Sequence, residues 1–340
     1  MVLHFCGLRE SCISSTIMKF LRPSLVVTVC SDVNDDWMEE TYIRFIDNAG
    51  NALMHEVKMT YAKGQHYHVI DAILILGRQS LACVLSDLPG LGLFDMQTGE
   101  LRHVHQMKHH CGVGKIVHVP RESLIVWGTA SGLSLFDDES LSLSGSIYLG
   151  RYVTGVLGGF TNDFLASCVV VGRQMEGLHI VNIEQRAIVR TISLPQLPVH
   201  GSINNLNNLS LAASGLQLAV TRDTHLYVVY LCPNEHEYQH HQLVRAPTCV
   251  SFVGDNRLVF SNGNDIIILD IISSEWLHQF HLRDAYFPRY CATLSNSNWA
   301  VVACLEDEDQ VHGCLYKIQL ETPYKVELIC EDCVEALFLE

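Results

Sequence analysis

The chain has 340 residues, with 22 Lys and Arg against 37 Asp and Glu, so its formal charge is −15. Hydrophobic residues make up 48% and charged residues 17%, which excludes a disordered chain, because such chains have few apolar residues and many charges. The acidic balance also argues against a nucleic-acid-binding protein, since phosphate contacts need clustered Lys and Arg.

The number and setting of the cysteines and the length of the apolar runs indicate the cellular compartment. The 13 cysteines are odd in number and most lie within apolar, strand-like stretches, which is typical of free buried thiols. The longest apolar runs, 164–171 and 266–272, are too short to span a bilayer. The sequence therefore predicts a protein of the cytosol or nucleus that does not insert into membranes.

A repeated pattern of short strands runs along the chain. An apolar strand ends in a polar residue, a turn follows, and a further strand comes after the turn. The equivalent end positions are Asp47, Asp95, Asp137, Asn182, Tyr230, Asp270 and Lys317. Their spacings are 48, 42, 45, 48, 40 and 47 residues, a period typical of propeller blades.

Most repeats also contain two earlier strands, which gives four strands per unit. A lone four-stranded sheet cannot bury both of its faces, whereas seven sheets arranged radially cover one another. We therefore predict an all-β fold, a seven-bladed β-propeller of four-stranded antiparallel blades, as a single domain over residues 1–340. A β-sandwich pair, or a barrel with a second domain, would not explain seven repeats. The expected blades are 13–59, 68–107, 113–149, 153–194, 205–245, 248–282 and 289–330.

Two strand-like pieces, 1–5 and 334–339, remain outside these blades. A ring must protect its first and last edges, so one of these pieces is expected to add to a terminal blade. The alternative is that 334–339 begins a further segment of a longer protein.

The ends of several third strands resemble the WD-repeat family. Residues 93–100 read Leu-Phe-Asp-Met-Gln-Thr-Gly-Glu, and similar endings surround Asp47, Asp137 and Asp270. The family's Gly-His dipeptide and Trp-Asp pair are absent. The resemblance implies that Asp47, Asp95, Asp137 and Asp270 stabilise turns. It also implies a rigid scaffold that binds other proteins.

Several clusters could carry other chemistry. His103, His105, His109, His110 and Cys111 could form a metal site, but the sequence favours a solvated loop, because no carboxylate ligand lies close by. The pair Cys330 and Cys333 has no second pair at zinc-site spacing, and the acidic run 306–309 is typical of a solvated turn. No serine elbow or phosphate loop is present, so no catalytic residue, metal ligand or cofactor is predicted.

The predicted function is a non-catalytic interaction scaffold or adaptor within a larger protein complex. In a propeller, connections between blades and second-to-third strand turns share one face, where exposed aromatic and arginine side chains are common interface anchors. The predicted partner-binding residues are Arg151, Tyr152, Arg173, Arg222, Tyr286 and Phe287. The alternatives are that Tyr286 and Phe287 only cap the ring, that the protein is an enzyme with a site in a central channel, or that it is a metal-binding module.

Overall fold

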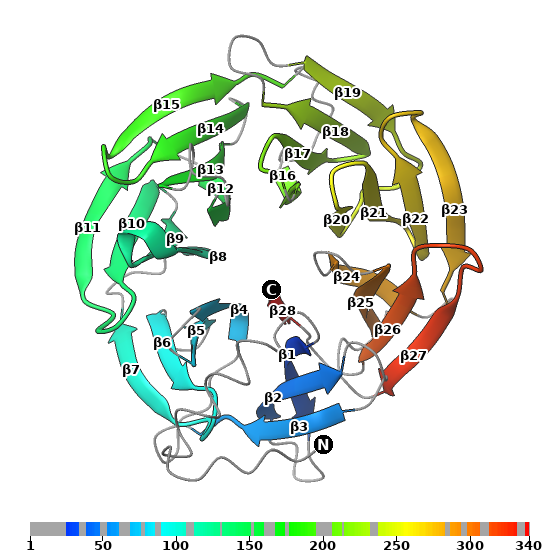
Figure 1. Cartoon of the computed structure of the whole chain (residues 1–340). Helices are drawn as coiled ribbons and strands as arrows, with labels where there is room; N and C mark the ends of the chain where they lie inside the picture. Colours follow the sequence, from blue (N-terminus) through cyan, green and yellow to red (C-terminus); the bar gives the residue numbers. More distant parts are fainter. Residues whose placement is uncertain are drawn as a thin grey trace, which may run out of the picture.

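Seven four-stranded antiparallel sheets form a ring in the computed structural model (Figure 1). It describes residues 25–33, 39–47, 53–60, 69–75, 79–85, 90–106, 112–129, 131–150, 153–159, 167–173, 177–194, 206–212, 214–231, 237–282, 286–293, 298–306, 313–331 and 337–339. The seven-bladed propeller predicted from the repeat is therefore confirmed. No helix among these residues has the length and apolar character needed to span a bilayer.

The strands occupy four positions from the centre of the ring outward. The innermost strands are β28 (Leu337–Leu339), β4 (Val69–Ile75), β8 (Gly112–Val119), β12 (Val153–Gly159), β16 (Leu206–Leu211), β20 (Val250–Val253) and β24 (Tyr286–Thr293). The second strands are β1 (Leu25–Val33), β5 (Ser80–Leu85), β9 (Leu124–Thr129), β13 (Cys168–Arg173), β17 (Gln217–Arg222), β21 (Arg257–Asn262) and β25 (Trp299–Glu306). The third strands are β2 (Glu39–Asp47), β6 (Gly90–Asp95), β10 (Gly132–Asp137), β14 (Gly177–Asn182), β18 (His225–Tyr230), β22 (Asp265–Asp270) and β26 (Gly313–Gln319). The outer strands are β3 (Leu53–Lys58), β7 (Leu101–Gln106), β11 (Leu143–Tyr148), β15 (Ala187–Ile192), β19 (Glu237–Gln242), β23 (Glu275–His281) and β27 (Val326–Glu331).

We number the blades 1 to 7 in the order of their second strands, from β1 to β25. The third and fourth strands are joined with a register shift in six blades, and only blade 5 pairs them regularly. A shift of this kind inserts one residue and increases the local twist of the sheet. It therefore bends the outer strand in the same place in blade after blade.

Blade 1 contains strands from both ends of the chain. The sequence prediction took all four of its strands from residues 13–59, but the structure makes β28 its innermost strand, paired with β1 through Val29 and Leu337. This corrects the limits of the first blade. Pairing with β28 covers the inner edge of β1, which would otherwise expose unpaired backbone groups. Residues 1–5 lie outside the described residues.

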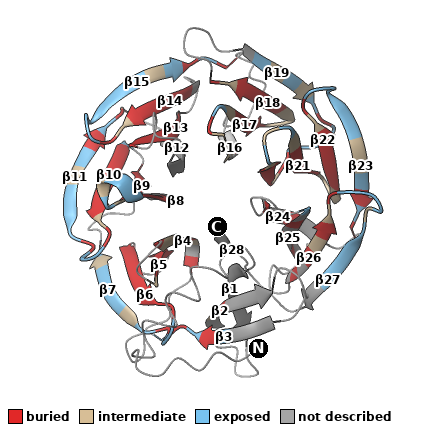
Figure 2. Cartoon of the chain, viewed as in Figure 1, coloured by how far each residue is buried: buried red, intermediate tan, exposed pale blue. Residues whose placement is uncertain are grey.

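The hydrophobic core lies between blades. One cluster joins Val220 and Val229 of blade 5 to Ile180 of blade 4, and another joins Val228 of blade 5 to Ile267 of blade 6. Corresponding clusters join each of the consecutive blade pairs from 1 to 7. Figure 2 shows this where burial is described: strands such as β18 and β22 are buried, and outer strands such as β15 and β23 are largely exposed. The second and third strands therefore have apolar side chains on both faces, which explains why their sequences do not alternate strictly.

Candidate functional site

The ring has two faces, and different turns lie on each. The face that contains the second-to-third strand turns 223–224 and 263–264 and the connection 243–249 is named the upper face. These segments are joined: the Leu243 N–H donates to the Thr224 carbonyl at 2.8 Å, and the Arg245 N–H donates to Asn262 Oδ1 at 3.0 Å. The upper face is where the sequence predicted partner binding.

The predicted binding residues have different positions relative to this face. Arg151 and Tyr152 lie outside the described residues. Arg173 ends β13, and Tyr286 and Phe287 begin β24, so their backbones lie at the upper ends of these strands. Arg222 ends β17, but only 5% of its surface is exposed. Arg222 is therefore not the exposed anchor that was expected, because it shares a strand face with Val220, which packs against blade 4.

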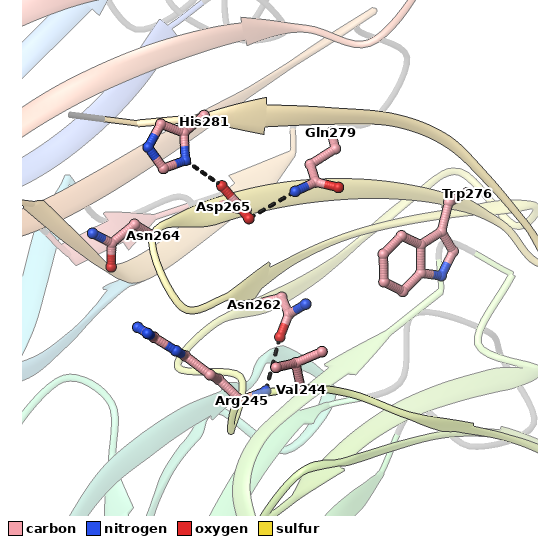
Figure 3. A pocket seen from close by; sticks show the side chains of 8 residues that line it. All are labelled: Val244, Arg245, Asn262, Asn264, Asp265, Trp276, Gln279 and His281. Carbon is pink, nitrogen blue, oxygen red and sulfur yellow. Dashed lines mark hydrogen bonds and ion pairs between the residues drawn. The ribbon is translucent and has the colours of Figure 1, made fainter. Parts of the chain in front are cut away.

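A pocket of about 460 Å³ opens on the upper face between blades 5 and 6 (Figure 3). Its walls come from the connection after β19, the β21–β22 turn and the outer strand β23. The lining residues are Val244, Arg245, Asn262, Asn264, Asp265, Trp276, Gln279 and His281.

One wall of the pocket is a fixed polar network. Asp265 Oδ1 lies 2.6 Å from His281 Nδ1, and Asp265 Oδ2 accepts a hydrogen bond from Gln279 Nε2 at 2.7 Å. The register of the sheet explains this contact, because Asp265 and His281 are direct partners across β22 and β23. The carboxylate is thus held in one orientation at the pocket wall.

The rest of the pocket combines apolar surface with a cation. Val244 is 82% exposed and Trp276 is 46% exposed, so both offer apolar area to a partner. The Arg245 side chain packs over Gly263, where φ is +71° and an added Cβ would lie 2.8 Å from Arg245 Cδ. A side chain at position 263 would displace Arg245 and would be strained at this positive φ, which explains why this tight turn contains glycine.

The pocket residues were missed by sequence reasoning. Val244 and Trp276 lie 32 positions apart, on different blades, and neither belongs to a recognisable motif. The only local signal was a Trp on an outer strand, where most side chains face solvent. The neighbourhood of these residues depends on the packing of blade 5 against blade 6.

Described histidines occur in pairs on two outer strands, β7 and β19. His105 packs edge-on against Phe136 of blade 3 with 4.9 Å between ring centroids, and residues 109–111 lie outside the described residues. On β19, His240 pairs with Tyr227 and His241 with Leu226, so the two histidines point to opposite faces of the sheet. Among the residues that the structure describes, no three His, Cys, Asp or Glu side chains are arranged to hold a metal ion.

The aspartates at the third-strand ends bind the turns that follow them. Asp95 Oδ1 accepts the N–H groups of Gln97 and Thr98 at 2.8 and 2.9 Å. Asp137 Oδ1 accepts the Ser140 N–H at 2.8 Å, and Asp270 Oδ1 accepts the Ser273 N–H at 2.9 Å. The structure does not describe the side chain of Asp47. At these three positions the carboxylate accepts hydrogen bonds from backbone N–H groups of the turn. These contacts stabilise the turn.

Comparison with known proteins defines the class by its fold. No family model matches the chain, and no curated protein matches it. A chain of the solved structure titled "Crystal Structure of Mitotic Checkpoint Complex" is similar over 80% of this chain and 80% of that chain, with a TM-score of 0.60 and 12% sequence identity. Such a low identity shows the fold alone. With seven four-stranded antiparallel sheets, the fold is that of a WD-repeat-like β-propeller.

Proposed function

We propose that the protein is a non-catalytic interaction platform, a subunit of a larger protein complex, which binds a partner protein at the upper-face pocket. The observation that carries this proposal is the pocket between blades 5 and 6, which offers exposed Val244 and Trp276 beside a fixed polar wall. Apolar anchors surrounded by polar groups are typical of protein interfaces. The similar solved chain also comes from a structure titled as a complex.

Polar groups on the innermost strands support a non-catalytic role. Asp71 Oδ2 accepts the Ile116 N–H at 2.9 Å, which joins β4 to β8. Ser210 Oγ accepts the Phe252 N–H at 3.0 Å, which joins β16 to β20. These side chains hold neighbouring blades together near the centre of the ring, so their polar atoms are engaged in structure.

The proposed binding surface extends across the upper face from this pocket. It includes the ends of β13 and β24, where the backbones of Arg173, Tyr286 and Phe287 lie. The partner is expected in the cytosol or nucleus, and the protein needs no cofactor for this role.

Val244→Asp tests the proposal with little risk to the fold, because Val244 is largely exposed. The matched control is Ile272→Asp, since Ile272 is also an exposed aliphatic residue, at 74%, but lies in the β22–β23 turn on the opposite face. We expect Val244→Asp to reduce recovery of the partner at least tenfold in affinity purification from native cells, because a buried charge would face an apolar interface. Ile272→Asp should leave recovery unchanged.

The thermal unfolding temperature of both variants should match that of the unchanged chain. Equal recovery with Val244→Asp and Ile272→Asp would reject the pocket as the partner site. Failure of the unchanged chain to retain any specific partner would reject the interaction platform itself.

A further inference from the structure

Arg222 is a buried cation at the upper end of β17. Its exposed fraction is 5%, and its enclosed Nε atom has no hydrogen-bond partner among the described residues. None of the ion pairs among the described residues includes Arg222. An enclosed guanidinium normally has a carboxylate or phosphate partner, because removing a charge from water without compensation is costly.

The same face of blade 5 carries further polar groups near Arg222. In the register of the sheet, Arg222 pairs with His225, and Tyr227 pairs with His240. His225 Nδ1 and His240 Nε2 lie 2.7 Å apart, and the rings of Tyr227 and His240 stack with centroids 4.9 Å apart. The Tyr227 hydroxyl is also enclosed, and within the described part of the chain it has no hydrogen-bond partner. Two enclosed donor atoms, Arg222 Nε and the Tyr227 hydroxyl oxygen, therefore occur on one sheet face.

Electrostatic interactions link these groups to Arg222. Burial lowers the pKa of His225. The nearby His240 and Arg222 lower this pKa further, whereas the negative charge of Asp223 raises it. Burial also raises the pKa of Tyr227, whereas the positive charge of Arg222 acts to lower it. At neutral pH the tyrosine is thus protonated and can donate, and the histidine is mainly neutral. Arg222 supplies a positive charge that acts on both His225 and Tyr227, and Asp223 in the adjoining turn opposes it.

We propose that Arg222, together with Tyr227, His225 and His240, forms an oxyanion-binding site between blades 4 and 5 on the upper face. Its ligand is a carboxylate or phosphate group presented by a side chain of the partner protein. Arginine suits this chemistry because its planar N–H groups match the paired oxygens of both anions. This inference rests on the proposed function, because the partner protein proposed there supplies the side chain that bears the anionic group.

Thermal unfolding of the purified full chain tests the site without the partner. The probes are sodium phosphate and sodium acetate, each compared with sodium chloride at equal ionic strength. A ligand that binds only the folded state raises the unfolding temperature, so we expect a saturable rise of about 2 to 4 °C. A rise with acetate indicates a carboxylate ligand, and a rise with phosphate alone indicates a phosphorylated side chain.

Arg222→Met removes the charge and keeps an unbranched side chain. We expect this variant to unfold at a higher temperature than the unchanged chain in chloride, because the uncompensated cation is gone, and to lose the anion-dependent rise. Arg222→Gln provides a second variant that keeps polar character, and it should also lose the rise. Arg190→Met is the matched control, since Arg190 lies on β15 of blade 4 and stays partly in solvent; it should keep the rise in full.

The outcomes separate this site from the proposed function. An equal anion-dependent rise in Arg222→Met and the unchanged chain would overturn the site, and so would the absence of any rise beyond chloride. Neither result depends on whether a partner is recovered through the pocket between blades 5 and 6.

Discussion

At the scale of single residues, the side chain that ends the third strand controls the turn after it. Asp95, Asp137 and Asp270 each accept hydrogen bonds from backbone N–H groups two or three residues further on. Asn182 does the same through Oδ1, which accepts the Gln185 N–H at 2.7 Å. A short side chain with an acceptor oxygen is enough for this role, so the position tolerates Asn as well as Asp.

Asp270→Ala should lower the free energy of unfolding by about 1 kcal/mol at pH 7, the usual net value of such hydrogen bonds. The pKa of Asp270 is lowered chiefly by the hydrogen bond from the Ser273 backbone N–H. A lowered pKa stabilises the folded state above the unfolded pKa of about 4, and this stabilisation is lost as the pH falls through the folded pKa. The difference between the two chains should therefore shrink between pH 5 and pH 3.

Denaturant unfolding at several pH values measures this effect. Asp270→Asn keeps an acceptor oxygen, so it should retain much of the stability at pH 7 but lose the acid dependence. Glu275→Ala, at an exposed position beyond the turn, is the control and should change stability by less than about 0.5 kcal/mol. A cost of Asp270→Ala that stays constant down to pH 3 would contradict the assigned role of its charge.

At the scale of secondary-structure elements, β28 decides how the ring closes. Its three residues pair with Val27, Thr28 and Val29 of β1, and it also contacts β4 and β24 of the adjoining blades. The strand therefore joins the two ends of the propeller at its innermost position (Figure 1). Such closure protects the edge of β1, which is an apolar strand able to pair with other chains.

Leu337→Gly combined with Leu339→Gly should weaken β28, because glycine disfavours extended structure. We expect a loss of about 3 kcal/mol, from about three net ladder hydrogen bonds. Concentration-dependent self-association through β1 should accompany it. Leu337→Val with Leu339→Val is the control, because valine favours strands and should preserve both properties. Unfolding curves and light scattering report the two effects; an equally stable, monodisperse glycine variant would show that β28 does not close the ring.

At the scale of the whole molecule, stability depends on contacts between blades. Ile267 of blade 6 is completely buried against Leu226 and Val228 of blade 5, and Val84 of blade 2 is buried in the cluster shared with blade 3. Each blade thus completes the core of its neighbours. A closed ring of this kind should unfold as one cooperative unit, because a blade cannot open without exposing two apolar faces.

Ile267→Ala should lower the free energy of unfolding by about 3 kcal/mol, and Val84→Ala by about 2 kcal/mol, since each leaves a cavity in a close-packed interface. The two sites share no partners, so the double variant should show the sum of the two effects within about 0.5 kcal/mol. All three chains should unfold in a single transition. Val189→Ala, at a half-exposed position on β15, is the control. A second transition in either single variant would mean that blades unfold independently.

The sequence alone determined the number of blades and the order of strands within most of them. These features follow from local patterns: apolar runs of strand length, turn residues between them, and acceptor side chains at third-strand ends such as Asp95 and Asp270. The marker in blade 7 was less accurate, because β26 ends at Gln319 and not at Lys317. That blade lacks an acidic side chain at the strand end, so no turn-binding residue fixed the boundary.

Only the tertiary structure decided which distant residues meet. The pairing of β28 with β1 joins segments from the two ends of the chain, and no local pattern encodes such a contact. The pocket likewise depends on blade 5 lying against blade 6, which brings Val244 and Trp276 into the lining of one pocket. Arg222 had the pattern of an exposed turn residue, but the packing of blade 5 on blade 4 encloses it. Local sequence specifies strands and turns, whereas burial and neighbourhood arise when those strands pack, because each blade's surroundings come from the next blade.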